Sequence, residues 1–132
     1  MKTSSAKQKG RILQQTVRDA ILENFSQLEP DDVRSTSMGA SGADVLLSPA
    51  AKKCFGYTVE CKNQQTTSIW SWWDQCTKNV LANTTPLLVF KRNNSKPLVV
   101  ITLQHFMELT RENYELKQKL GKSELDRTTE TL

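Results

Sequence analysis

The sequence predicts an α/β or α+β fold in which helices pack on a sheet, and three observations support this prediction. The chain has 132 residues, the length of one ordinary domain. Segments with apolar residues at helical spacing alternate with short apolar runs, in the order α-β-β-β-α-β-β-α. A short polar turn separates the last two runs and predicts a hairpin. We therefore expect an α/β protein with a mixed central sheet flanked by helices.

The first half of the chain is expected to contain one helix and three strands. Apolar residues at helical spacing, among them Leu13 and Val17, predict a helix over residues 11–28. The segment Glu-Pro-Asp-Asp, residues 29–32, ends it. Three strands are then expected over 33–36, 43–48 and 54–61, joined by a glycine- and serine-rich loop at 37–42 and by a connection at 48–53.

The second half is expected to contain two helices with a hairpin between them. The helices are expected over residues 68–82, with Ser68 as N-cap, and over residues 104–120. The hairpin strands are expected over 86–92 and 97–103, with the turn at 93–96. We expect residues 1–10 to form a basic flexible arm, 11–120 a single domain and 121–132 a polar C-terminal tail.

Composition and charge exclude several classes of protein. The apolar runs are far shorter than the roughly 20 residues of a membrane span, and no apolar signal segment is present, which favours a cytoplasmic protein. The 3 cysteines form no Cys-x-x-Cys pair and there is 1 histidine, which argues against a disulfide framework or a zinc finger. The net charge of +4 favours a polyanionic partner such as nucleic acid, although a basic protein without such a partner fits it equally well.

Charged side chains stand on two of the predicted strands, where apolar residues are expected. Asp44 opens the second strand directly after the glycine-rich loop, and Glu60 and Lys62 are two residues apart on the third. Because residues i and i+2 of a strand point to the same face, the Glu60 carboxylate and the Lys62 ammonium are expected side by side.

These three residue types suit phosphodiester hydrolysis. Mg²⁺ prefers hard oxygen ligands, usually one or two carboxylates with water and phosphate, and Asp44 and Glu60 could supply the carboxylates. The metal would activate water, and Lys62 could orient or deprotonate that water or hold a phosphate oxygen. The alternative is a surface Glu–Lys ion pair beside an unrelated aspartate, worth only about 0–1 kcal/mol.

The pattern VRSTSMGASGADVLLS…YTVECKNQ, over residues 33–48 and 57–64, resembles the PD-(D/E)XK nuclease superfamily. It is most similar to archaeal-type Holliday junction resolvases and related phage endonucleases, and the resemblance covers roughly residues 9–103. It implies a restriction-endonuclease-like fold with Asp44 and Glu60 as ligands of Mg²⁺ or Mn²⁺ and Lys62 as a catalytic residue. It also implies a phage protein acting in the host cytoplasm as a homodimer on DNA, including branched DNA.

Two glutamines bear on this resemblance. The family usually carries a glutamine on the helix after the Glu-x-Lys strand, and Gln75 matches it as a further catalytic residue. The family often carries a metal-binding glutamate four residues after a glycine in the first helix, whereas this chain has Gln14 after Gly10. Gln14 either faces the site as a neutral supporting group or reaches solvent at the edge of the apolar stripe.

The residues expected to contact nucleic acid surround this site. In resembling resolvases the loop at 37–42 touches DNA and often holds a catalytic serine, for which Ser37 and Ser41 are both candidates. Basic residues before and after the loop would bind backbone phosphates without reading sequence. The expected contacts are Lys9, Arg11, Arg34, Ser37, Ser41, Gly42 and Lys53. On the helix at 68–82, Trp73 is expected in the core, and Trp72 in packing more than in base stacking.

We therefore predict a divalent-metal-dependent DNA endonuclease that selects branched DNA. The alternative is a catalytically weak or inactive nuclease-fold module that binds DNA, suggested by the missing glutamate at Gln14. A third hypothesis is a small basic protein with a structural or regulatory role and no catalysis.

Overall fold

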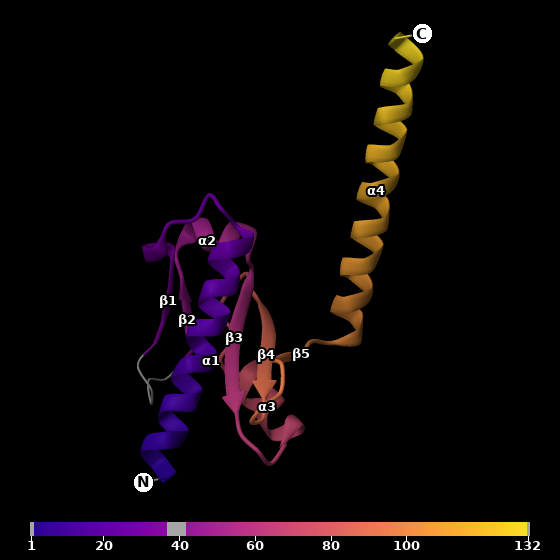
Figure 1. Ribbon diagram of the computed structural model, residues 1–132. Coiled ribbons are helices and arrows are strands. Elements are labelled where there is room, and N and C mark those ends of the chain that lie inside the picture. The colour runs from indigo at the N-terminus through magenta and orange to yellow at the C-terminus, as the bar shows by residue number, and fades with distance from the viewer. Residues whose placement is uncertain (1, 37–41, 132) are drawn as a thin grey trace. The chain divides into compact units, whose positions relative to one another are not determined.

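The structure is a computed structural model that describes residues 2–36 and 42–131, with side chains described for 5–36 and 42–122. The chain divides into two compact units, Met1–Val100 and Ile101–Leu132. The boundary after residue 100 differs from those expected after residues 10 and 120. The elements are α1 (Lys2–Asn24), the 3₁₀ turn η1 (Pro30–Asp32), β1 (Val33–Ser35), β2 (Val45–Leu47), α2 (Pro49–Cys54), β3 (Tyr57–Asn63), α3 (Ile69–Lys78), β4 (Thr85–Lys91), β5 (Leu98–Val100) and α4 (Leu103–Thr131) (Figure 1).

The strands of the first unit form two small sheets. Strands β1 and β2 pair antiparallel, as a strand–loop–strand order predicts. Strand β3 pairs parallel with β4, and β4 pairs antiparallel with β5, so the three-stranded sheet is mixed. Asn94 in the β4–β5 turn has a φ of 61°, a left-handed conformation that asparagine tolerates better than most residues. The expected mixed α/β fold and its hairpin are confirmed.

Helices cover both faces of the three-stranded sheet. The adjacent β4 residues Leu88 and Val89 belong to different apolar clusters, and adjacent strand residues point to opposite faces. Val89 packs in the cluster that contains Leu13 and Val17 of α1. Leu88 packs with Trp72 of α3. Strand β3 therefore runs between two helical layers, and charged groups on it are withdrawn from water.

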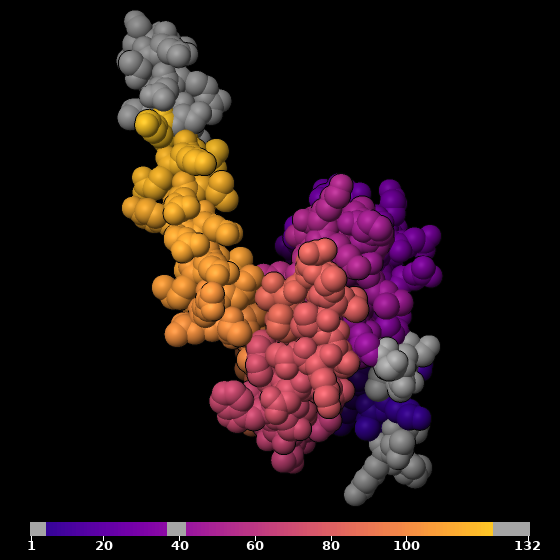
Figure 2. All heavy atoms as spheres, turned by 180° about the vertical axis from the view of Figure 1, so that it is seen from behind, coloured from indigo at the N-terminus to yellow at the C-terminus, as the bar shows by residue number. Residues whose placement is uncertain are grey.

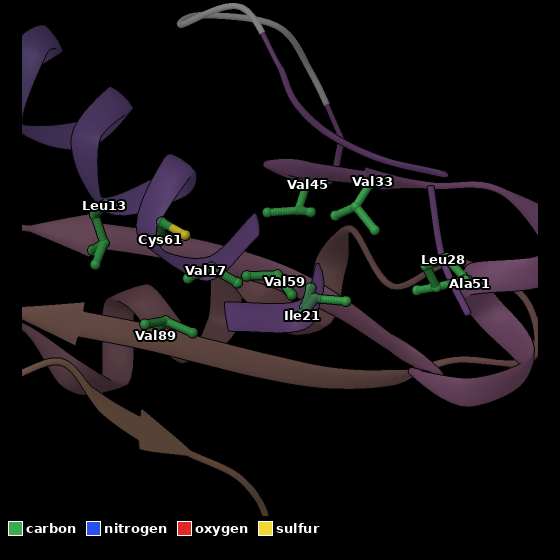
Figure 3. Packing of buried hydrophobic residues seen from close by; sticks show 10 residues of the cluster. All are labelled: Leu13, Val17, Ile21, Leu28, Val33, Val45, Ala51, Val59, Cys61 and Val89. Carbon is green, nitrogen blue, oxygen red and sulfur yellow. The ribbon is translucent and has the colours of Figure 1, made fainter. Parts of the chain in front are cut away.

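The larger cluster joins α1 to both sheets (Figure 3). Ile21 of α1 lies beside Val59 of β3 and Leu13 lies closer to Cys61 of the same strand, while Val33 and Val45 come from the two-stranded sheet. Val33 and Val59 are fully buried. Burying a side chain of this size stabilises a fold by about 1.5–3 kcal/mol, so this cluster fixes the two sheets against one helix.

Several elements begin or end elsewhere than expected. Helix α1 begins at Lys2 rather than at residue 11, so the expected flexible arm is helical from Lys2 onward. Its lysines, glutamine and alanine are good helix formers and outweigh the single Gly10. Helix α4 likewise continues to Thr131 through the expected tail. No helix in the described part of the chain has an apolar stretch long enough to cross a membrane.

A short helix replaces the expected connection at 48–53. Ser48 is the N-cap of α2, and its hydroxyl oxygen accepts a hydrogen bond from the Ala51 N–H at 3.1 Å. Pro49 occupies the first turn, where a missing N–H costs nothing. The strand expected over 54–61 consequently runs over Tyr57–Asn63 instead. This shift places Lys62 inside the strand with Glu60.

The burial of the α3 tryptophans also differs from the expectation. Trp72 is 5% exposed and packs at a ring-centroid distance of 6.0 Å from Phe90, which confirms packing for this residue. Trp73 is partly buried and packs against the same cluster, so it lies at the edge of the core rather than inside it as expected. Ser68 stands at the N-cap but its side chain makes no capping hydrogen bond. The helix is therefore oriented by Trp72 and Cys76 on the sheet.

Candidate active site

Asp44 links the two sheets of the first unit. Its backbone N–H donates to the Val59 carbonyl at 3.0 Å, and its carboxylate Oδ2 accepts the Cys61 N–H at 2.8 Å. On its other side the Asp44 carbonyl accepts the Thr36 N–H at 3.1 Å. Hydrogen bonds to a charged acceptor contribute about 1.5–3 kcal/mol. Asp44, which the sequence singled out and which directly precedes β2, is thus held against the middle of β3.

Glu60 and Lys62 point from β3 to the same side, as expected. In the parallel register Glu60 lies opposite Leu88 and Lys62 opposite Phe90, so both face the α3 layer. The Lys62 Nζ lies 3.6 Å from the Glu60 Oε1. The Glu60 residue is 4% exposed and the Lys62 side chain 19%. The alternative of an exposed surface ion pair is therefore wrong.

Burial perturbs both carboxyl groups, and repulsion by Asp44 adds to the effect at Glu60. Burial raises the pKa of Glu60 to about 7, with a further contribution from repulsion by Asp44, while Lys62 partly offsets the rise. Burial likewise raises the pKa of Asp44, and the Cys61 N–H and Lys62 oppose it. The two carboxyl groups and the lysine thus form one electrostatic unit. A cluster of this kind is typical of functional sites.

The carboxylates of Asp44 and Glu60 are the groups here that could hold a divalent cation. Among the residues with described side chains, no group of three or more His, Cys, Asp or Glu is placed to bind one. Two carboxylates with water and a phosphate oxygen are, however, a normal ligand set for Mg²⁺. A cation there would also relieve the repulsion that raises the Glu60 pKa. The residues present therefore fit a divalent cation.

The two glutamines lie in different environments. Gln14 on α1 is 3% exposed, so the alternative in which it reaches solvent is wrong. Gln75 on α3 is exposed, and within the described residues its side chain makes no hydrogen bond. Its predicted contact with Lys62 or with a substrate phosphate stays a prediction. Gln75 directly precedes Cys76, which is buried on the same side of the sheet as Glu60.

The expected nucleic-acid contacts are spread over the first unit. Ser37 and Ser41 lie outside the described residues. Arg34 lines an open cavity of about 490 Å³ with Arg18 and Asp19. The remaining residues are surface positions: Gly42, with a φ of 100°, is partly exposed, and Arg11 and Lys53 are exposed.

Sequence reasoning expected Lys9 to contact nucleic acid, but it did not find the basic cavity at the end of β3 and β4 that Lys9 lines. Lys9 and Lys91 line an open cavity of about 410 Å³ together with Asn63. Asn63 and Lys91 lie opposite each other in the parallel register, and the Asn63 Nδ2 donates to the Lys9 carbonyl at 3.3 Å. The pairing of β3 with β4 brings Asn63 and Lys91 together, and α1 adds Lys9. Lys91 and Asn63 at two strand ends were the signal that could have found them.

A mixed sheet that carries a Glu-x-Lys pair, with an aspartate hydrogen-bonded to the same strand, is compatible with the PD-(D/E)XK class of proteins. The profile of the family described as "Phage putative PDDEXK endonuclease" matches residues 5–130, and the chain belongs to this family. No curated protein and no solved structure matches the chain significantly. The resemblance to Holliday junction resolvases in particular stays a prediction.

The raised pKa of Glu60 predicts that the metal-free protein loses stability as pH rises. Between the ordinary value of 4.5 and about 7, the unfolded chain releases this proton while the folded chain retains it. Ionisation therefore favours the unfolded state over this range. We expect urea denaturation in EDTA to show a loss of up to about 3 kcal/mol between pH 5 and 8. Glu60→Gln should lose much less, and equal losses in both proteins would contradict the assignment.

The bond between Asp44 and Cys61 predicts different effects for two substitutions. Asp44→Asn keeps an oxygen acceptor for the Cys61 N–H, whereas Asp44→Ala leaves that buried donor without one. We expect Asp44→Ala to be about 1–3 kcal/mol less stable than Asp44→Asn in urea denaturation at pH 7 in EDTA. Both variants remove the same negative charge, so their difference isolates the hydrogen bond. Equal stabilities would show that this bond contributes nothing.

Proposed function

We propose that the protein is a divalent-metal-dependent endonuclease that hydrolyses phosphodiester bonds of DNA on a restriction-endonuclease-like fold. The observation that carries the proposal is the buried Glu60–Lys62 pair with Asp44 held against the same strand. Membership of the family described as "Phage putative PDDEXK endonuclease" supports it. An ion pair that served only the fold would not need a second carboxylate that repels it.

Asp44 and Glu60 are proposed to hold Mg²⁺ or Mn²⁺. When bound, the cation would activate a water molecule and neutralise charge developing on the phosphate. The Cys61 N–H bond orients the Asp44 carboxylate through Oδ2. Because the pKa of Glu60 is about 7, protons compete with the cation for this carboxylate below neutral pH. The environment of Glu60 therefore makes cation binding weaken as pH falls below about 7.

Lys62 is proposed to act on the water or on the scissile phosphate. Its side chain keeps 19% exposure, and its Nζ lies 3.6 Å from the Glu60 Oε1. It also lowers the pKa of Glu60 and so favours the ionised form that a cation needs. Gln75 is proposed as a further polar group on the substrate side, and Gln14 as a buried neutral support.

DNA is the proposed substrate, and branched DNA the proposed preference. The basic residues of the first unit, Lys9, Arg11, Arg34 and Lys53, are proposed to bind backbone phosphates. The cavity with Lys9 and Lys91 supports this role, because two lysines and several asparagines offer donors to a phosphate. A homodimer in the host cytoplasm would place two sites on the two strands of a junction.

The inactive DNA-binding module is the second candidate, because Gln14 stands where resembling nucleases often carry a metal-binding glutamate. It predicts binding without cleavage. The proposed enzyme instead predicts that cleavage requires metal and that Glu60 and Lys62 are needed for it.

A cleavage assay tests the proposed activity. We expect wild-type protein to cut DNA with Mg²⁺ or Mn²⁺ and not with EDTA, on a panel of linear duplex, single strand, flap and four-way junction. Glu60→Gln and Lys62→Met should each lower the rate by at least about 100-fold while DNA binding is retained, since each removes one charged group from the site. Cleavage that persists in both variants would point to a contaminant. Junction binding without cleavage by wild type would favour the inactive module.

The basic cavity predicts a change in DNA affinity without a change at the site. The double variant Lys9→Ala/Lys91→Ala should bind duplex DNA in EDTA more weakly, and the slope of log affinity against log salt should fall by up to about 2. Lys122→Ala on α4 is the matched control and should leave both quantities unchanged. Unaltered binding by the double variant would remove the cavity from the DNA-binding surface.

A further inference from the structure

Helix α4 carries an apolar stripe that its own unit cannot bury. It is the one element that the structure describes in the unit Ile101–Leu132. Figure 2 shows its described side chains around a single helix, coloured orange to yellow. Phe106, Leu109, Leu116 and Leu120 are between 39% and 62% exposed. A single helix has no second layer with which to exclude water from these groups, so they are suited to a partner.

The spacing of these residues is that of a coiled-coil seam. Phe106, Leu109, Leu116 and Leu120 follow the alternating spacings of three and four residues that place them at a and d positions of a heptad repeat. The a position in the middle of the seam is Asn113, which is exposed. A single asparagine at an a position favours a two-stranded, in-register arrangement, because each amide can bond to its counterpart.

The charges beside the seam fit a second copy of the same helix. Glu112 stands at a g position and Lys117 at the following e position, the two positions that face each other across a parallel dimer. Within its own helix Glu112 has Glu108 and Glu115 as neighbours at i−4 and i+3, which repel it. Lys117 has no acid three or four residues away. Neither charge has an opposite partner three or four residues away on α4, and a second α4 would give each of them one.

We propose that α4 forms a parallel, in-register, two-stranded coiled coil with α4 of a second copy of this chain. Asn113 sets the register, and Glu112 of each copy pairs with Lys117 of the other. The dimer is held by the second unit, whereas Asp44, Glu60 and Lys62 all lie in the first. The proposal is thus independent of the nuclease activity, and its test needs neither DNA nor metal.

Charge reversal in the full-length chain tests the pairing. We expect sedimentation equilibrium to show a dimer for wild type, weakened about tenfold or more by Glu112→Lys or Lys117→Glu alone. The double reversal should restore the wild-type affinity to within about threefold, because the pairs are complementary again. Glu115→Lys and Lys122→Glu are matched controls that make the same charge changes away from the seam. Both controls should dimerise like wild type.

Circular dichroism separates loss of pairing from loss of the helix. Glu112→Lys removes the repulsion by Glu108 and Glu115, so α4 should stay helical in this variant even though the dimer weakens. Asn113→Leu is a second variant, which should associate more tightly but with mixed stoichiometry. A wild-type chain that stays monomeric at about 100 μM would overturn the proposal, because a second copy would then not be the partner. A dimer indifferent to both single reversals would also overturn it.

Cysteine crosslinking tests the orientation. In a Cys54→Ser background, Phe106→Cys and Leu120→Cys should each form a disulfide between copies, because a parallel in-register dimer brings every a position next to itself. An antiparallel pair can satisfy at most one of the two. Crosslinking at one position only, or at neither, would contradict the parallel arrangement.

Discussion

The hydrogen bond from the Cys61 N–H to the Asp44 carboxylate is the interaction on which the rest of the first unit depends. With the backbone bond from Asp44 to Val59, it joins the two-stranded sheet to the three-stranded one. An acceptor at this position need not be charged for the fold alone, since an amide oxygen would serve. Because burial disfavours the charged form of Asp44, the carboxylate lowers the stability of the fold. This loss of stability is understandable if the negative charge has a function. The same contact that completes the sheet also fixes the carboxylate beside Glu60.

That arrangement sets stability against function. Burial and repulsion by Asp44 both raise the pKa of Glu60, and Lys62 partly offsets this rise. A structural role would be met better by an apolar side chain at this strand position, as Val59 shows on the other face. The raised pKa thus means that the protein alone does not fully stabilise the negative charge of Glu60. A divalent cation would complete it, and folding and cation binding are then linked, since the cation stabilises the folded chain alone.

The charged centre of the site could be predicted from the sequence because it depends on local rules. The two-residue period of a strand places Glu60 beside Lys62, and the structure confirms this. What failed depends on long-range packing or on competing local signals. Trp72, rather than Trp73, is the buried tryptophan, because the direction from which the sheet approaches α3 decides which side is covered. The Lys91–Asn63 pair arises only from parallel pairing across many residues. Helix α2 was missed although Ser48 and Pro49 are ordinary start signals, because its six residues are too few for a periodic pattern.

The two units therefore solve different physical problems. The first unit contains every described helix and strand except α4. Its charged cluster of Asp44, Glu60 and Lys62 therefore depends on neighbouring groups of the same chain. The second unit contains α4, with the apolar seam over residues 106–120 and the opposite charges Glu112 and Lys117. A second copy of the same helix is complementary to this seam and to these charges. A self-complementary helix would generate twofold symmetry without any contribution from the first unit. Since DNA strands run antiparallel, twofold symmetry is the geometry that presents equivalent sites to both strands. The site chemistry and the pairing of copies can consequently be altered one at a time.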